Sequence, residues 1–220
     1  MDGVHYHNAE IIIQPSENRS SVAGVILYLF SLIGVLAGII FFIYKFTPDN
    51  KFNRRFLLIL TGLTLLGLGF RLWIAWQTNQ SLPDTPARLT GDEPGYDYLA
   101  YALLQGEFFQ WPGRTPVYPL FLALSYALFG HSFAAALYFQ AIIGAAAVPL
   151  SFLFANHFFN QKHSLVVAAV ISLHPALSLH VTRLYSEVIY TPLLLLALLA
   201  LMVALKSGDW KHFALAGALL

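Results

Sequence analysis

Four carboxylates lie close together in one stretch of the chain, at Asp92, Glu93, Asp97 and Glu107. Neighbouring carboxylates can accept a proton from an attacking hydroxyl group, and they can also hold a divalent cation such as Mg²⁺ or Mn²⁺. Long hydrophobic runs flank this stretch on both sides. We therefore expect residues 91–129 to form the active loop of a membrane enzyme, with Asp92 as base and with Asp92 and Glu93 as the candidate metal ligands.

A structural role alone would also account for Asp92. It precedes Pro94 and a short apolar helix, and Asp is favoured at a helix N-cap, with Pro in the first turn. The two roles are compatible, because helix N-terminal amides keep a capping carboxylate ionised and fixed. Such a carboxylate can still orient a hydroxyl group and take its proton.

The composition places the chain in a lipid bilayer. Hydrophobic residues make up 58% of its 220 residues and charged residues only 10%, whereas soluble domains carry roughly 25% charged residues. The chain has no cysteine, which excludes disulfides, thiolate metal sites and a cysteine nucleophile. The formal net charge of +1 argues against a nucleic-acid partner held through its phosphates.

Hydrophobic runs predict an all-α, polytopic bundle of transmembrane helices in the cell membrane. Residues 1–21 form a polar N-terminal tail, residues 22–54 an extra helix with a basic cytoplasmic loop, and residues 55–220 the main transmembrane domain. The outer loop, residues 77–131, contains two helices too short to span, Gly95–Gln105 and Pro116–Phe129. The predicted spans are Val22–Tyr44, Phe56–Trp76, Ser132–Phe159, Ser164–His180 and Val188–Leu205.

Three points stay open. If Pro116–Phe129 spans the bilayer, Glu187 moves to the cytoplasmic side; the basic loops favour the other topology. Arg71, within a span, either snorkels to the interface or points into a polar cavity. The hydrophobic run Phe213–Leu220 begins another span, so we expect the chain to be the N-terminal portion of a longer protein.

Further candidates lie on the same outer side. Arg114 and Arg183 suit bidentate recognition of phosphate. Glu187 follows Arg183 by four residues, so the two form a helical salt bridge or Glu187 supplies a second carboxylate toward Asp92. The catalytic candidates are therefore Asp92, Glu93 and Glu187. The candidates for substrate binding are Asp97, Arg114, Tyr118 and Arg183.

The order of motifs resembles that of the C-type (GT-C) membrane glycosyltransferases, in particular the dolichyl-phosphate-mannose protein mannosyltransferase-like proteins and their aminoarabinose transferase branch. The shared features, over residues 55–206, are the Asp-Glu pair, a short helix, Leu-Leu-x-Gly-Glu at 103–107, Arg-Thr-Pro-Val-Tyr-Pro from Arg114, Leu-Phe-Gly-x-Ser at 128–132 and Leu-Tyr-Ser-Glu ending at Glu187. The segment Val22–Tyr44 has no counterpart in the family, and the later spans of that family are missing.

The resemblance implies a function and roles for residues. Asp92 matches the first-loop carboxylate that acts as base, Glu187 matches an acidic residue that returns to the active site, and the two short helices match juxtamembrane helices. Family members transfer a sugar from a polyprenyl-phosphate donor, with inversion, on the non-cytoplasmic face. The acceptor is a hydroxyl group of a protein, lipid or glycan.

Two other functional classes compete with this hypothesis. A transporter or flippase of lipid-linked sugars would need charges deep within its spans, and Arg71 is the residue that comes nearest. A structural membrane subunit would tolerate amides in place of both Asp92 and Glu187.

Overall fold

A computed structural model describes residues 54–107 and 114–219, and it confirms the all-α prediction. The predicted tail, the span Val22–Tyr44 and most of the basic loop lie outside the described residues. The elements are α2 (Arg54–Ser81), η1 (Pro86–Arg88), α3 (Glu93–Leu104), α4 (Val117–Phe129), α5 (Phe133–Ala145), α6 (Ala147–Ala155), α7 (Gln161–Ser172), α8 (Pro175–Leu179), η2 (His180–Thr182), α9 (Glu187–Ser207) and α10 (Trp210–Ala218).

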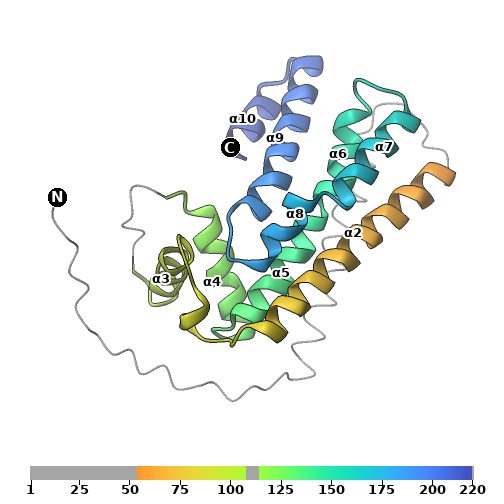
Figure 1. Ribbon diagram of the computed structural model, residues 1–220. Coiled ribbons are helices and arrows are strands. Elements are labelled where there is room, and N and C mark those ends of the chain that lie inside the picture. The colour runs from red at the N-terminus through yellow and green to blue at the C-terminus, as the bar shows by residue number, and fades with distance from the viewer. Residues whose placement is uncertain (1–53, 108–113, 220) are drawn as a thin grey trace.

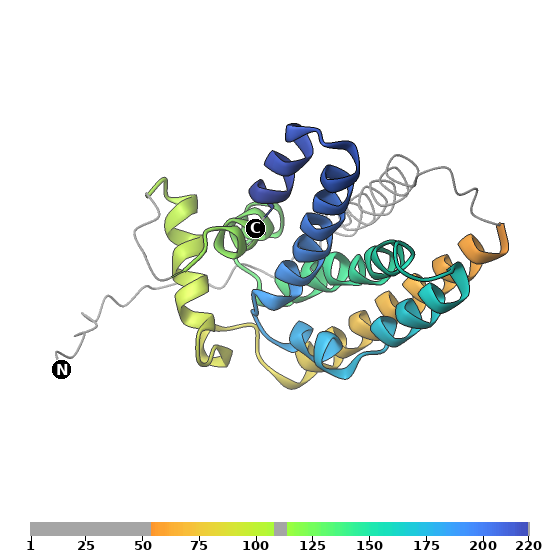
Figure 2. The ribbon, with the colours of Figure 1, turned by 90° about the horizontal axis from the view of Figure 1, so that it is seen from above.

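Helix α2, the continuous pair α5–α6, and α9 are long and apolar enough to cross a membrane. Helix α7 and the α8–η2 segment make a fourth candidate span if they are counted together, and they are bent by 44°. These elements lie alongside one another in Figures 1 and 2. The spans predicted in the described residues are therefore present, although the one at Ser164–His180 is broken rather than straight.

The break in that fourth span is stabilised by Arg71. Pro175 has no N–H group, so it leaves the carbonyl of Ile171 without its helical partner. The Arg71 guanidinium, buried at 1% exposure, donates to the carbonyl oxygens of Ser172 at 3.0 Å and Ile171 at 3.2 Å, and to that of Gly67 at 3.0 Å. Arg71 therefore does not snorkel to the interface; it caps the C-terminal end of α7, where a cation is favoured.

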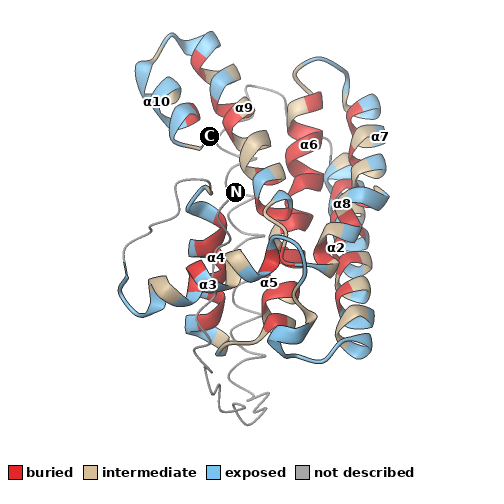
Figure 3. Ribbon diagram, turned by 60° about the vertical axis from the view of Figure 1, so that its left-hand side comes forward, coloured by how far each residue is buried: buried red, intermediate tan, exposed pale blue. Residues whose placement is uncertain are grey.

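The α3–α4 pair stands to one side of the long helices (Figure 2). Its buried face belongs to the larger hydrophobic core, which includes Ala100 from α3 and Tyr118, Leu122 and Tyr126 from α4, and Figure 3 shows this inward burial. The predicted short helices are thus both present. Helix α3 ends at Leu104, and Gly106 follows it with a φ of +79°, a conformation that favours glycine.

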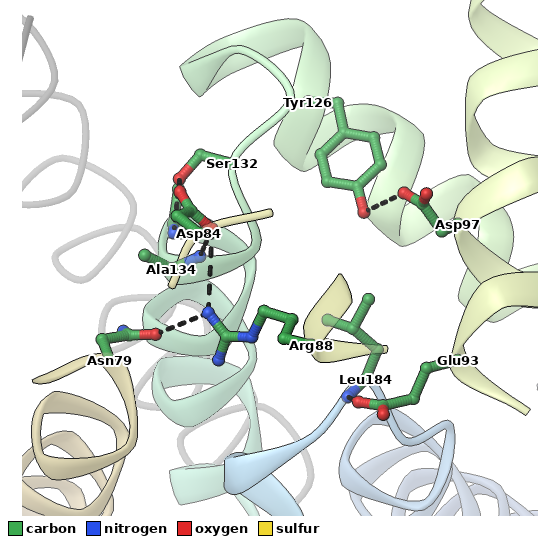
Figure 4. Close-up of polar contacts among 10 residues, drawn as sticks. Asn79, Asp84, Arg88, Glu93, Asp97, Tyr126, Ser132, Ala134 and Leu184 are labelled. Carbon is green, nitrogen blue, oxygen red and sulfur yellow. Dashed lines mark hydrogen bonds and ion pairs between the residues drawn. The ribbon is translucent and has the colours of Figure 1, made fainter. Parts of the chain in front are cut away.

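Asp97 fastens α3 to α4. Its Oδ1 accepts a hydrogen bond from the Tyr126 hydroxyl at 2.8 Å and lies 2.7 Å from His131 Nε2 (Figure 4 draws the Tyr126 bond). Burial raises the pKa of Tyr126 well above its usual value, and the charge of Asp97 and the hydrogen bond to it add to that effect. The phenol therefore remains a donor at physiological pH.

The loops that carry the candidate residues meet at one end of the bundle. Leu184, just before α9, donates its N–H to Glu93 at the start of α3. Because α4 has only 13 residues, it is too short to span, and the chain returns to the same end at Glu187. The topology with Asp92 and Glu187 on one side is therefore the one that the structure supports.

The close approach of α2 and α7 predicts opposite effects for two glycines of α2. A Cβ atom at Gly67 would lie 3.0 Å from the carbonyl oxygen of Ser172 and 3.2 Å from its Cα, whereas a Cβ at Gly69 would meet nothing within 4 Å. We expect Gly67→Ala to lower the free energy of unfolding by about 1–3 kcal/mol through overpacking. Gly69→Ala should leave it unchanged or raise it by up to about 1 kcal/mol. Thermal unfolding in detergent measures both, and equal values would contradict the close packing.

The raised pKa of Tyr126 predicts a loss of stability at alkaline pH. Above about pH 10 the unfolded phenol ionises while the folded one does not, so stability is full below that pH and falls as the pH rises. We expect Tyr126→Phe to reduce the slope between pH 10 and pH 11.5 by about 1.4 kcal/mol per pH unit. Tyr98→Phe, at an exposed position of the same helix pair, is the matched control. Identical slopes for wild type and Tyr126→Phe in SDS-titrated micelles would refute this prediction.

Candidate active site

Asp92 is exposed and paired with a cation. Its Oδ1 accepts a hydrogen bond from Arg114 Nη2 at 2.8 Å, and its side chain is 71% exposed, against 17% for Arg114. Asp92 occupies the N-cap position of α3, but its side chain makes no capping hydrogen bond. The predicted cap is therefore wrong, because Asp92 has helical dihedral angles that turn its side chain away from the helix amides, and Arg114 holds the carboxylate instead.

Arg114 is held in place by the first turn of α3. Its guanidinium carbon lies 4.4 Å from the centre of the Tyr96 ring, a cation–π contact. Gly95 permits this approach, because a Cβ atom there would lie 3.2 Å from Arg114 Nη2. Asp92, Gly95 and Tyr96 thus determine where the Arg114 charge lies, although Arg114 follows Asp92 by 22 positions in the chain.

Glu93, in contrast, is buried and fully engaged. Its Oε2 accepts hydrogen bonds from the backbone N–H of Thr90 at 2.8 Å and the Thr90 hydroxyl at 3.2 Å. Its Oε1 accepts from the backbone N–H of Leu184 at 2.8 Å, and Figure 4 draws Glu93 and Leu184. The first of these bonds closes the turn just before α3, of which Glu93 is the first residue. Glu93 therefore joins the outer loop to the segment before α9.

Arg183 lies beside Glu93. Its Nη1 is 3.6 Å from Glu93 Oε2 and also contacts the Thr90 hydroxyl. The predicted helical pairing of Arg183 with Glu187 is wrong, because Arg183 is extended (φ −139°, ψ 164°) and α9 begins only at Glu187. Glu187 itself is exposed at the first turn of α9, with Ser186 Oγ 3.4 Å from its Oε2.

Tyr118 is inside the protein. At 1% exposure, its hydroxyl donates to Gln140 Oε1 at 2.9 Å, and Gln140 Nε2 donates to the carbonyl oxygen of Arg183 at 2.6 Å. Burial raises the pKa of Tyr118 well above its usual value, and the charges of Glu93 and Glu187 contribute. Tyr118 is thus a neutral hydrogen-bond donor beneath the site.

Sequence reasoning missed two residues of this arrangement, Gln140 and Tyr96. The signal for Gln140 was its amide within an otherwise apolar predicted span, since polar residues in spans are costly and are retained for a reason. Tyr96 lies within the short helix, and its hydroxyl donates to Ser186 Oγ at 3.2 Å. It gave no signal, because nothing in the sequence says that residue 186 lies next to it.

A second anchor fixes the other end of the outer loop. Asp84 accepts hydrogen bonds from the Ser132 hydroxyl at 2.7 Å and the backbone N–H of Ala134 at 3.0 Å, so it helps to cap α5. Arg88 donates to Asn79 at 3.2 Å and lies 3.7 Å from Asp84 (Figure 4). Burial lowers the pKa of Arg88, an effect opposed by the charge of Asp84.

The donor set does not fit a metal ion held by the protein. Over the described ranges, no group of three or more His, Asp or Glu side chains comes together. Both oxygens of Glu93 already accept hydrogen bonds from N–H groups, and one oxygen of Asp92 bonds Arg114. Asp92 and Glu93 therefore offer too few free oxygens to hold a metal ion by themselves.

Asp92, Glu93, Arg114 and Arg183 thus lie at the same end of the bundle, with Tyr118 behind them and Asp97 committed to the α3–α4 contact. The arrangement combines one exposed carboxylate with two arginines, which suits proton acceptance beside a phosphate group.

Comparison with known proteins finds a similarity over the second half of the chain. The family model for dolichyl-phosphate-mannose-protein mannosyltransferases matches residues 113–220, which include Arg114, Tyr118, Arg183 and Glu187 but not Asp92 or Glu93. No curated protein and no solved structure matches the chain. Residues 113–220 are thus similar to this family of mannosyltransferases, and the all-helical fold with several candidate membrane spans agrees with that similarity.

Proposed function

We propose that the protein transfers a sugar from a polyprenyl-phosphate donor to a hydroxyl group of a protein, lipid or glycan, with inversion, on the non-cytoplasmic face of the cell membrane. The observation that carries this proposal is the exposed Asp92 carboxylate paired with Arg114 at 2.8 Å. An exposed ion pair contributes only about 0–1 kcal/mol to stability. Fold stability alone therefore gives little reason for this pair, whereas a reaction that needs both a base and a cation does.

In the proposed reaction the acceptor oxygen attacks the anomeric carbon of the donor sugar. A new carbon–oxygen bond forms on one face as the bond to the phosphate oxygen breaks on the other, and the bond electrons leave with the lipid phosphate. The hydroxyl proton passes to the Asp92 carboxylate, which becomes a carboxylic acid and later releases the proton to water. The configuration of the anomeric carbon is inverted, because attack and departure occur on opposite faces.

The lipid phosphate gains negative charge as it leaves, and arginine is suited to receive it. Arg114 presents a planar guanidinium with five N–H donors, and stacking on Tyr96 leaves its charge in place when a phosphate competes with Asp92. Arg183, about half exposed and next to Glu93, is the second candidate for this phosphate. Cations already positioned where charge develops stabilise a transition state without reorganisation.

The remaining site candidates receive supporting roles. Glu93 positions the loop before α9, Tyr118 orients Gln140, and Asp97 keeps α3 against α4. Glu187 is exposed at the same end of the bundle, where it can contact the acceptor or assist Asp92. A divalent cation, if the reaction uses one, would need ligands from the donor phosphate in addition to Asp92.

The alternative function, a transporter or flippase of lipid-linked sugars, depended on Arg71 as a charge deep within a span. Arg71 is bonded to two backbone carbonyls at the bend of a span and to one of its own helix, and its charge therefore has a structural use. No observation in the described residues specifically favours transport over transfer.

Asp92→Asn should abolish sugar transfer while the protein still folds. The amide oxygen can still accept the Arg114 hydrogen bond, so the variant removes the base and keeps the contact. Loss of a general base typically costs 10²–10⁴-fold in rate. The measurement is transfer from a short-chain polyprenyl-phosphate sugar by the complete membrane protein in detergent. Glu107→Gln, an exposed carboxylate in the same loop, is the matched control, and wild-type transfer by Asp92→Asn would remove Asp92 as base.

Arg114→Lys should distinguish the contribution of the positive charge at this position from that of the planar guanidinium group. Lysine keeps the positive charge but lacks the planar fork and its stacking on Tyr96. We expect kcat to fall by roughly 10- to 100-fold, with a smaller change for Arg88→Lys, whose side chain is bound inside the loop and faces no substrate. An unchanged kcat for Arg114→Lys would show that Arg114 does not act on the phosphate.

A further inference from the structure

The peptide group between Arg183 and Leu184 forms hydrogen bonds to buried side chains through both its carbonyl oxygen and its N–H group. Gln140 Nε2 donates to its carbonyl oxygen at 2.6 Å, and its N–H donates to Glu93 Oε1 at 2.8 Å. Because the peptide group is planar, these two hydrogen bonds determine its orientation. We call Gln140, Glu93 and this peptide group the peptide clamp.

Both side chains of the peptide clamp are buried and come from different helices. Gln140 lies on α5 at 0% exposure, and Glu93, at 4% exposure, begins α3. The orientation of the Gln140 amide follows from its partners: the Tyr118 hydroxyl donates to Oε1 at 2.9 Å, while the Arg183 carbonyl can only accept and therefore faces Nε2. Tyr118, Gln140 and the clamped peptide thus form a continuous chain of hydrogen bonds through the interior.

The peptide clamp lies between two exposed charged residues. The Arg183 side chain leaves the chain on one side of it, and Glu187 starts α9 three residues after Leu184. Leu184 is buried at 1% exposure and Val188 at 4%, so the segment is also anchored by apolar packing. Tyr96, from α3, adds a third polar contact at Ser186.

We propose that Gln140, a residue 43 positions before Arg183, is a positioning residue that aims Arg183 and Glu187 at the bound donor phosphate and acceptor. This inference rests on the proposed function. Gln140 touches no substrate; it acts through the Arg183–Leu184 peptide group. Displacing a charged group by about 1 Å can cost 10²-fold in rate, so an error in this peptide plane should be visible in kcat.

Gln140→Met tests the inference in the complete membrane protein, because Met has a similar shape and neither a donor for Arg183 nor a strong acceptor for Tyr118. We expect kcat to fall about tenfold or more, with the KM for the donor changing much less. Hydrogen exchange should become faster at the Leu184 amide and its neighbours. Thr64→Val is the matched control, since Thr64 is buried on α2 and bonds only its own helix, at Leu60. Wild-type kcat in Gln140→Met, or an equal loss in Thr64→Val, would overturn the inference.

If Gln140→Met fails to fold, Gln140→Glu tests the positioning role of Gln140 instead. The carboxyl group can accept from Tyr118 in either state, but it can donate to Arg183 only when protonated. We expect kcat of this variant, relative to wild type, to rise as the pH is lowered; parallel pH profiles would overturn the inference. Failure of the proposed function has a different signature, namely wild-type transfer by Asp92→Asn, and the Leu184 exchange rate still reports on the peptide clamp in that case.

Discussion

The bend in the fourth candidate span depends on one buried cation. A guanidinium in an apolar interior is costly unless its donors are satisfied, and the broken end of α7 offers free carbonyls to satisfy them. The two Nη groups of Arg71 bond Ile171 and Ser172, although Arg71 Nε is buried without a hydrogen-bond partner. The charge and the break therefore each lower the cost of the other. Because the chain turns there, α8 and η2 lead back across the bundle, and residues 183–186 arrive beside α3.

Gly67 and Gly144 make room for this arrangement. A side chain at Gly67 would strike α7, and one at Gly144 would approach Val188 Cγ1 to 2.8 Å and Arg71 Nε to 4.0 Å. Helices α2, α5, α7 and α9 therefore meet around Arg71 at short range. Small residues at helix crossings allow this in membranes, where packing and polar contacts hold helices together.

The site consists of a buried layer of polar side chains and, above it, a layer of charged side chains nearer to solvent. In the buried layer, Tyr118, Gln140 and Glu93 are connected by hydrogen bonds through the Arg183–Leu184 peptide group, which makes their geometry rigid. Above it, Asp92, Arg114, Arg183 and Glu187 keep charged groups near solvent. Polar groups held by a rigid layer can keep a fixed arrangement before a substrate binds, and preorganisation of this kind is the largest contribution to catalysis in many enzymes.

The sequence alone determined the helical class, the number of spans in the described residues and the two short helices, because hydrophobic length and turn residues are local properties of the chain. It also singled out the Asp92–Glu93 pair, but it could not separate the two residues: one is exposed and paired with Arg114, and the other is buried under the segment before α9. Only the tertiary structure decided that difference, the capping role of Arg71 and the involvement of Gln140. Each depends on a partner distant in the chain, at 22, 100 and 43 positions for Arg114, Ile171 and Arg183, and no local pattern records which distant backbone groups a bend will leave exposed.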